Sequence, residues 1–232
     1  MTWKPEVEEL RTRRKLAEQM GGAEKVARQH SRGKLDARAR IKGLVDPGSF
    51  REIGKIAGKG HYGPDGELLD LSPSNLVFGR ANIESRPVVA SADDFTVRGG
   101  AADAAIHRKF VQCEQMAHTL KIPLIRMIDG TGGGGSVKTL EDIGATYVPA
   151  TPGWGEIVKN LETVPVVALA LGPTAGLGAA RVVASHYSIM VKGLSQLFAA
   201  GPAVVEAIGE ASDKESLGGS AIHTRNGVVD EE

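Results

Sequence analysis

The sequence predicts an α/β fold, in which buried strands alternate with helices around one sheet. Apolar runs typical of buried strands occur at 122–130 and 164–172, and segments with helical periodicity lie between and beyond them. Each of these two runs leads directly into a glycine cluster, at 130–135 and at 172–178. A chain of 232 residues is long enough to bury a sizeable core around such a sheet.

The composition argues against several classes of function. Lys plus Arg and Asp plus Glu both total 28, so the net charge is zero and bulk attraction to nucleic acid or an anionic membrane is not expected. Aromatic residues make up 4% of the chain, too few for base-stacking platforms. The single cysteine, Cys113, argues against a disulfide framework or a cysteine-based zinc site, and we expect no metal in this domain. No signal peptide or membrane span is apparent, so we expect a cytoplasmic protein.

The first 45 residues are predicted to form a helical arm. They are charged and favour helix, and apolar residues such as Leu10, Leu16 and Met20 are sparse. We therefore expect the arm, 1–45, to pack against something else, such as another subunit. The turn "DPGSF" then opens the domain proper, 46–232.

The domain begins with a loop and a hairpin. The polar, glycine-rich stretch 56–72 is expected to be a loop. Two apolar runs, 76–83 and 88–92, flank a polar turn and predict a β-hairpin. A helix follows, whose apolar stripe runs from Ile106 to Leu120 and includes Cys113, so we expect a buried, inert thiol there. The later elements are expected to be the strand 122–130, a helix near 154–162, the strand 164–172, a helix after Gly176, a strand at 187–191 and a helix within 199–210.

The glycine clusters have two explanations. Close packing is the better one for either cluster alone, whereas two clusters, each directly after a buried strand, favour backbone N–H groups that bind an anion or oxyanion. A phosphate loop is not favoured, because "GTGGGGSVK" and "GPTAGLGAA" lack the required spacings. Ser-His-Asp hydrolysis is not favoured either, since no G-x-S-x-G elbow occurs. Two glycine loops, one leading into a helix N-terminus, can each supply one N–H to an enolate or thioester oxyanion.

Several motifs occur in a fixed order from about Gly33 to the end of the chain: "GKLDARARIKGLVDPGSF", "SADDFTVRGG", "IDGTGGGG", "LGPTAGLGAA", "IMVK" and "LGGSAIH". In this order they resemble the carboxyltransferase subunits of biotin-dependent acyl-CoA carboxylases. Two loops depart from that family: "DGTGGGG" stands where "DSGGAR" is usual, and Leu177 stands where glycine is common. Family chains continue into a second, similar domain, so the sequence resembles an N-terminal half with the C-terminal domain absent.

The resemblance implies a crotonase-like fold, a spiral of ββα units. It implies transfer of a carboxyl group from carboxybiotin to the α-carbon of an acyl-CoA, whose thioester oxygen becomes an enolate held by two backbone N–H groups. The implied donors are Gly133, with neighbours Gly132 and Gly134, and Gly176. The phosphates of CoA need a local basic patch in a neutral protein. The candidates for that patch, on and just before the helix that starts near residue 106, are Arg98, Arg108 and Lys109.

The implied partners are the acyl-CoA substrate, a biotin carboxyl carrier or biotin carboxylase subunit, a carboxyltransferase C-terminal domain and further copies of the chain in a homo-oligomer. Three alternatives remain open. The first is an acyl-CoA decarboxylase α subunit, and the second is an inactive acyl-CoA-binding or assembly module. The third is a crotonase-type hydratase or isomerase, which needs a carboxylate pair. Glu141 and Asp142 are the nearest pair, although a helix start explains them better.

Overall fold

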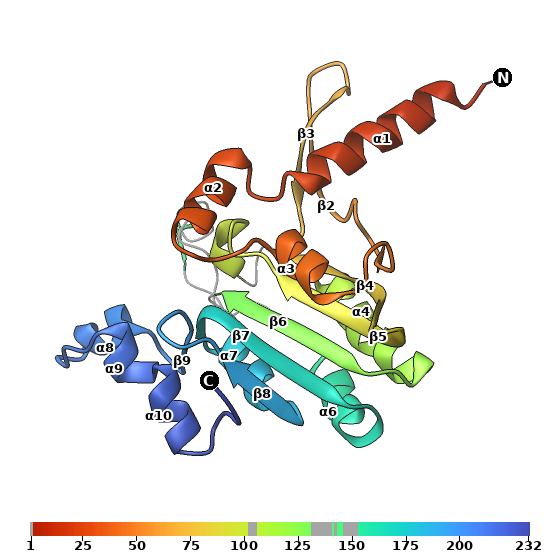
Figure 1. The fold of residues 1–232 in the computed structure, drawn as a ribbon. Helices are drawn as coiled ribbons and strands as arrows, with labels where there is room; N and C mark the ends of the chain where they lie inside the picture. Colours follow the sequence, from red (N-terminus) through yellow and green to blue (C-terminus); the bar gives the residue numbers. More distant parts are fainter. Residues whose placement is uncertain (1, 102–105, 131–140, 142, 146–152) are drawn as a thin grey trace.

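The computed structural model describes residues 2–101, 106–130, 141, 143–145 and 153–232 (Figure 1). Its centre is a seven-stranded sheet in the order β1-β4-β5-β6-β7-β8, with β9 paired to β7. Pairing is antiparallel from β1 to β5 and parallel from β5 onward. The strands are β1 (Arg51–Glu52), β4 (Leu76–Ile83), β5 (Arg86–Asp93), β6 (Leu124–Gly130), β7 (Val166–Ala175), β8 (Tyr187–Met190) and β9 (Gln196–Phe198).

Helices cover both faces of this sheet. Side chains alternate between faces along each strand. On β4, Val77 packs against Ile41 of α3, whereas Phe78 packs on the opposite side in a cluster with Cys113 of α4. The helices are α1 (Lys4–Glu18), α2 (Ala23–Ser31), α3 (Ala37–Leu44), α4 (His107–Leu120), α6 (Trp154–Thr163), α7 (Leu177–Val183), α8 (Pro202–Ala207), α9 (Lys214–Gly218) and α10 (Ser220–Arg225), with a 3-10 turn η1 (Arg98–Gly100).

The predicted α/β elements of the sheet are confirmed. The β4–β5 hairpin turns at Glu84 and Ser85, which have φ angles of 50° and 66°. Asp46, in the predicted turn, accepts hydrogen bonds from the N–H groups of both residues (2.9 and 2.7 Å). The strands β6 and β7 and the helices α4 and α6 lie where the apolar patterns place them. The short strands β1 and β9 were not predicted.

The prediction of a loop at 56–72 is wrong. This stretch contains a second, two-stranded sheet, β2 (Gly58–Tyr62) and β3 (Leu68–Pro73). Its side chains are mostly exposed, so the strands show no apolar alternation. A side chain at Gly58 would collide with the Ser72 carbonyl oxygen, so glycine there permits close pairing of the strands. The hairpin lies beside α1 (Figure 1), where Arg13 donates a hydrogen bond to the Tyr62 hydroxyl (2.7 Å).

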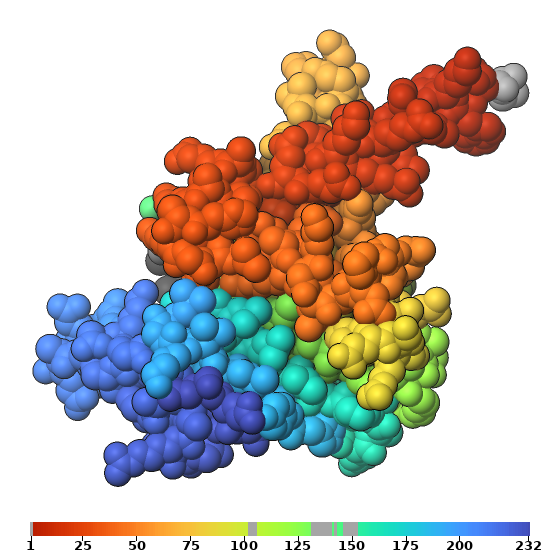
Figure 2. All heavy atoms as spheres, in the orientation of Figure 1, coloured from red at the N-terminus to blue at the C-terminus, as the bar shows by residue number. Residues whose placement is uncertain are grey.

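The N-terminal segment divides into two parts. α1 extends away from the sheet, and Ala17 is its one buried residue among those described. α2 and α3 lie on the body of the molecule (Figure 2). α3 contributes Ala37 and Ile41 to the core cluster formed with β4 and β5. The arm therefore meets the sheet of its own chain, while its division from 46–232 as a separate domain stays a prediction.

None of the described helices combines the length and apolarity that crossing a membrane requires.

Candidate active site

The two glycine clusters follow neighbouring strands. β6 and β7 pair in parallel from Leu124 opposite Val166 to Gly130 opposite Thr174, with a shift in register after Ile128. Because parallel strands end at the same edge of a sheet, both clusters begin at one edge. The predicted donors Gly132, Gly133 and Gly134 lie outside the described residues, so their role stays a prediction.

Gly176 makes the turn from β7 into α7. Its φ and ψ angles are 57° and −125°, a conformation that only glycine adopts readily. Its N–H donates a hydrogen bond to the Phe198 carbonyl (2.9 Å), where β9 pairs with β7. The N–H is already paired in this structure, which argues against Gly176 itself as an oxyanion donor. The sequence does not reveal this pairing, because β9 has only three residues and no recognisable pattern.

The first residues of α7 offer other donors. An α-helix leaves the N–H groups of its first turn without acceptors inside the helix. Those of Leu177, Gly178 and Ala179 have no acceptor among the described residues either. Gly178 is buried, and Leu177 is half-buried. These N–H groups lie one to three residues beyond the predicted donor.

A buried ion pair fixes the far end of α7. Arg126 of β6 and Glu114 of α4 form two hydrogen bonds, at 2.9 and 2.8 Å, and neither side chain is more than 1% exposed. Arg126 also donates to the Ala184 carbonyl at the end of α7 (2.7 Å). Asn160 of α6 donates a hydrogen bond to Glu114 (2.8 Å), which connects this neighbouring helix to the ion pair. The network therefore ties α7 to β6, α4 and α6.

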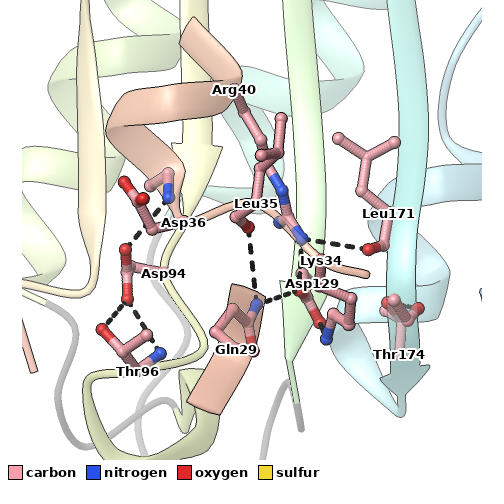
Figure 3. Close-up of polar contacts among 12 residues, drawn as sticks. Gln29, Lys34, Leu35, Asp36, Arg40, Asp94, Thr96, Asp129, Leu171 and Thr174 are labelled. Carbon is pink, nitrogen blue, oxygen red and sulfur yellow. Dashed lines mark hydrogen bonds and ion pairs between the residues drawn. The ribbon is translucent and has the colours of Figure 1, made fainter. Parts of the chain in front are cut away.

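A second buried ion cluster lies at the end of β6, one residue before the first glycine cluster (Figure 3). Asp129 is fully buried and accepts hydrogen bonds from Lys34 (2.8 Å), Arg40 (2.6 Å) and Gln29 (3.2 Å). Burial lowers the pKa of Lys34, although the carboxylate of Asp129 opposes this. Arg40 also donates to the Leu171 carbonyl of β7 (3.0 Å). Residues 29–40 are thereby fastened to the carboxyl ends of β6 and β7.

Close packing explains one glycine of the second cluster. A Cβ atom at Gly172 would lie 2.2 Å from Oδ1 of Asp129 and 2.5 Å from Nζ of Lys34. The buried ion pair therefore occupies the space of a side chain at this position. Close packing also explains Gly100, in the loop after β5. A Cβ atom there would lie 2.7 Å from the Cα of Gly130 at the end of β6.

The loop after β5 is held by Asp94. This buried carboxylate accepts hydrogen bonds from the N–H of Ala37 at the start of α3 (3.0 Å) and from the N–H of Thr96 (2.8 Å). It also bonds to the Thr96 hydroxyl (Figure 3). Its neighbour Asp93 pairs with Arg181 of α7 (3.0 Å). The "DDF" motif thus joins the arm, the loop after β5 and α7.

The structure does not bring the three predicted phosphate-binding residues to one surface. Lys109 is 5% exposed, its side chain lies near Gly54, and burial lowers its pKa to about 8 while Glu52 opposes the shift. Arg108 is exposed on α4, and Arg98 is exposed at the rim of a cleft beside α2. Lys109 therefore cannot serve as a surface cation for phosphate without rearrangement.

The sequence also singled out Cys113 and the pair Glu141 and Asp142. Cys113 is buried and its pKa is raised by burial, which confirms an inert thiol. Glu141 is exposed, and Asp142 lies outside the described residues. Within the described part of the chain, no group of His, Cys, Asp and Glu side chains could hold a metal ion.

A mixed sheet with helices on both faces, in which two neighbouring parallel strands each lead into a glycine-rich segment, is typical of crotonase-like domains. The chain belongs to the carboxyl transferase domain family, whose model matches residues 28–232. It is similar to the carboxyltransferase subunit of propionyl-CoA carboxylase from Haloferax mediterranei, with 30% identity over 99% of this chain and 44% of the relative. It is also similar to the methylmalonyl-CoA carboxyltransferase 12S subunit of Propionibacterium freudenreichii subsp. shermanii, with 32% identity over 96% of this chain and 41% of the relative.

Solved structures agree with this assignment. The crystal structure of the transcarboxylase 12S hexamer, with methylmalonyl-coenzyme A and methylmalonic acid bound, matches with a TM-score of 0.77 and 29% identity. The match covers 99% of this chain and 44% of that one. The chain thus spans less than half the length of these relatives, and its similarity to them confirms the family and the crotonase-like fold.

Proposed function

We propose that the chain is the acyl-CoA-binding half of a biotin-dependent carboxyltransferase. The reaction transfers a carboxyl group from carboxybiotin, a co-substrate carried on a partner protein, to the α-carbon of an acyl-CoA. The observation that carries the proposal is the pairing of β6 with β7 up to Gly130 and Thr174, which starts the two glycine clusters side by side. Donors from the two turns can then converge on one thioester oxygen.

The chain's own contribution is electrostatic. The proton of the α-carbon would pass to the biotin nitrogen that has released the carboxyl group. Its loss places negative charge on the thioester oxygen, and two N–H groups stabilise the resulting enolate, whose α-carbon accepts the carboxyl group. We assign one donor to the first turn of α7, at Leu177 or Gly178, and the other to the glycine cluster that contains Gly132, Gly133 and Gly134. No covalent nucleophile is needed in such a reaction, which agrees with the inert thiol of Cys113.

Proline substitutions on α7 test this assignment. Proline removes the N–H yet is tolerated in the first turn of a helix. With a complementing carboxyltransferase C-terminal half present, Leu177→Pro or Gly178→Pro should lower carboxyl transfer by about 10²-fold, the usual effect of losing one oxyanion donor. Leu177→Ala keeps the N–H and is the matched control. Folded proline variants that both keep the parent rate would remove α7 from the mechanism.

Binding without turnover would favour the alternative of an inactive acyl-CoA-binding module. The discriminating measurement is carboxyl transfer by the complemented complex, with acyl-CoA affinity measured in parallel. Full affinity with no transfer in any complemented complex would overturn the enzymatic proposal.

A further inference from the structure

We propose that Asp93 and Arg181 are positioning residues for carboxyl transfer, and that their ion pair holds α7 and the turn at Gly176 in the place that the reaction needs. The inference rests on the proposed function and adds to it a pair of residues that act through α7. Asp93 is the last residue of β5, and Arg181 belongs to α7.

The pair joins three elements. Nη1 of Arg181 donates hydrogen bonds to both carboxylate oxygens of Asp93, at 3.0 and 3.3 Å. The guanidinium group also lies over the ring of Phe110 in α4, with Cζ 4.7 Å from the ring centroid. The side chains of Arg181 and Asp93 are 14% and 16% exposed, so water screens this pair less than it screens a surface pair.

The helix that the pair holds has little apolar attachment of its own. α7 has seven residues, and helices of this length depend on tertiary contacts for their stability. Val182 is buried in the core, whereas Leu177 is half-buried and Val183 is 49% exposed. The position of α7 therefore depends strongly on its polar contacts.

These polar contacts act at two places along α7. Arg126 donates to the Ala184 carbonyl and holds the C-terminal end. Arg181 lies four residues after Leu177, on the same face of the helix. Because Cα–Cβ bonds in a helix tilt toward its N-terminus, the Arg181 side chain extends toward the first turn. Its pair with Asp93 is thus the contact that can set the place of that turn.

The pair also balances charge at the edge of the sheet where both glycine clusters begin. Asp93 and Asp129 lie at the carboxyl ends of neighbouring parallel strands, which pair as far as Ala92 and Met127. Burial raises the pKa of Asp93, Arg181 opposes the shift, and the carboxylate of Asp129 adds to it. Loss of Arg181 would therefore release α7 and also leave the charge of Asp93 without its cation.

Three variants separate position from charge. In the complex with a complementing carboxyltransferase C-terminal half, Arg181→Gln and Asp93→Asn should each lower kcat by at least about tenfold, since both release α7. KM for the acyl-CoA should stay within about twofold of the parent, because binding is not what the pair supports. The double variant should be no slower than Arg181→Gln alone, as expected of two residues that act as a unit. Arg181→Lys keeps the cation and should lose less than Arg181→Gln.

Amide hydrogen exchange of the 232-residue chain tests the hold on α7 without a partner. The N–H groups of Ala180 and Ala184 donate to the carbonyls of Gly176 and Ala180 (3.1 and 2.9 Å). Their exchange should be at least about fivefold faster in both Arg181→Gln and Asp93→Asn.

The matched control is Arg38→Gln. It breaks an ion pair of similar exposure, Arg38 with Glu52 at 2.9 Å, which lies on α3 and β1. It should lower the melting temperature but leave both kcat and the exchange of α7 at the parent's values.

The outcomes distinguish this inference from the proposed function. If Asp93→Asn keeps or exceeds the parent's kcat while Arg181→Gln is slow, charge rather than position matters and the inference is overturned. Parent kcat or parent exchange in both single variants overturns it as well, while the proposed function stands. If the parent complex transfers no carboxyl group, the proposed function fails, and the inference fails with it.

Discussion

Glycine at position 172 has a different role from glycine at position 176. Gly172 leaves room for the ion pair of Asp129 with Lys34, so close packing explains why this residue is glycine. Gly176 has a φ of 57° at the turn into α7, so the backbone conformation explains why this residue is glycine. Both glycines are therefore explained without a ligand. The donor that we propose on this side of the oxyanion site belongs to the residues that follow Gly176, at the start of α7.

Adding one methyl group at position 172 tests the packing explanation. Gly172→Ala places a Cβ 2.2 Å from Oδ1 of Asp129, so a buried ion pair must move. We expect a loss of about 2–4 kcal/mol in the free energy of unfolding, measured with urea. Gly43→Ala is the control: nothing lies within 4 Å of that Cβ on α3, and alanine there should stabilise by about 0.5–1 kcal/mol. Equal effects at the two positions would contradict the packing argument.

Lys109 gives the protein a pH-dependent stability. Its pKa is about 8 in the folded chain, against 10.5 for an unperturbed lysine, so between these values the unfolded chain binds more protons. The penalty for burying the charge is complete below about pH 8 and disappears as the pH rises to 10.5. Lys109→Met should therefore stabilise the protein by about 3 kcal/mol at pH 7 and remove the rise in stability between pH 8 and 10.5.

The control for Lys109 is its exposed neighbour. Arg108→Gln should change neither the stability at pH 7 nor its dependence on pH. CoA affinity of Lys109→Met should equal that of the parent, because the ammonium group is buried and not accessible to a phosphate. A large loss of CoA affinity in a stable Lys109→Met variant would restore the sequence-based prediction for this residue.

At the scale of elements, apolar periodicity predicted most of the fold. It identified β4, β5, β6, β7 and α4, because each buries a face against the core. It missed β2 and β3, whose side chains are mostly exposed, and β9, which has three residues. Asp129 pairs with Lys34 across 95 positions of the sequence, and no local pattern reveals such a contact. For the site, the turn at Gly176 was predicted correctly, the cluster after Gly130 stays a prediction, and the paired N–H of Gly176 depends on β9.

The two parts of the N-terminal segment should respond differently to truncation. Removing residues 1–12 takes away the outer part of α1, whose residues are exposed or half-buried, and should leave the melting temperature nearly unchanged. Removing residues 1–45 takes away α3 from the core and leaves Asp129 buried without Lys34 and Arg40. An uncompensated buried charge costs about 3–5 kcal/mol, so the shorter chain should fail to fold stably. A well-folded 46–232 fragment would show that the arm is an independent addition.

At the scale of the whole molecule, several large apolar side chains remain in solvent. Trp3, Val204 and Ile208 are 77%, 57% and 75% exposed, and the last two belong to α8 and its C-terminal end. Exposed apolar side chains that cluster favour association with a partner. We therefore expect sedimentation of the 232-residue chain to show an oligomer or aggregates. Val204→Ser/Ile208→Ser should reduce this association, whereas a monodisperse parent monomer would contradict the prediction.

Activity should depend on complementation. The relatives are more than twice as long as this chain, which covers 44% and 41% of two of them. We expect little or no carboxyl transfer from the 232-residue chain alone, measured as biotin-dependent decarboxylation of malonyl-CoA or methylmalonyl-CoA. Adding a carboxyltransferase C-terminal half should restore it. Full activity of the chain by itself would refute the half-enzyme proposal.

The position of Asp129, directly before the first glycine cluster, affects how the sequence of that cluster can vary. Its described partners come from residues 29–40, which are far in the sequence from the glycine cluster that begins at the next position. The contacts that hold this edge of the sheet together thus depend largely on one carboxylate and on cations that are distant from it in the sequence. Substitutions further along the cluster leave that anchor chemically intact. The departure of "GTGGGG" from the arginine-containing loop of the family therefore leaves the residues of this anchor, Lys34, Arg40 and Asp129, in place.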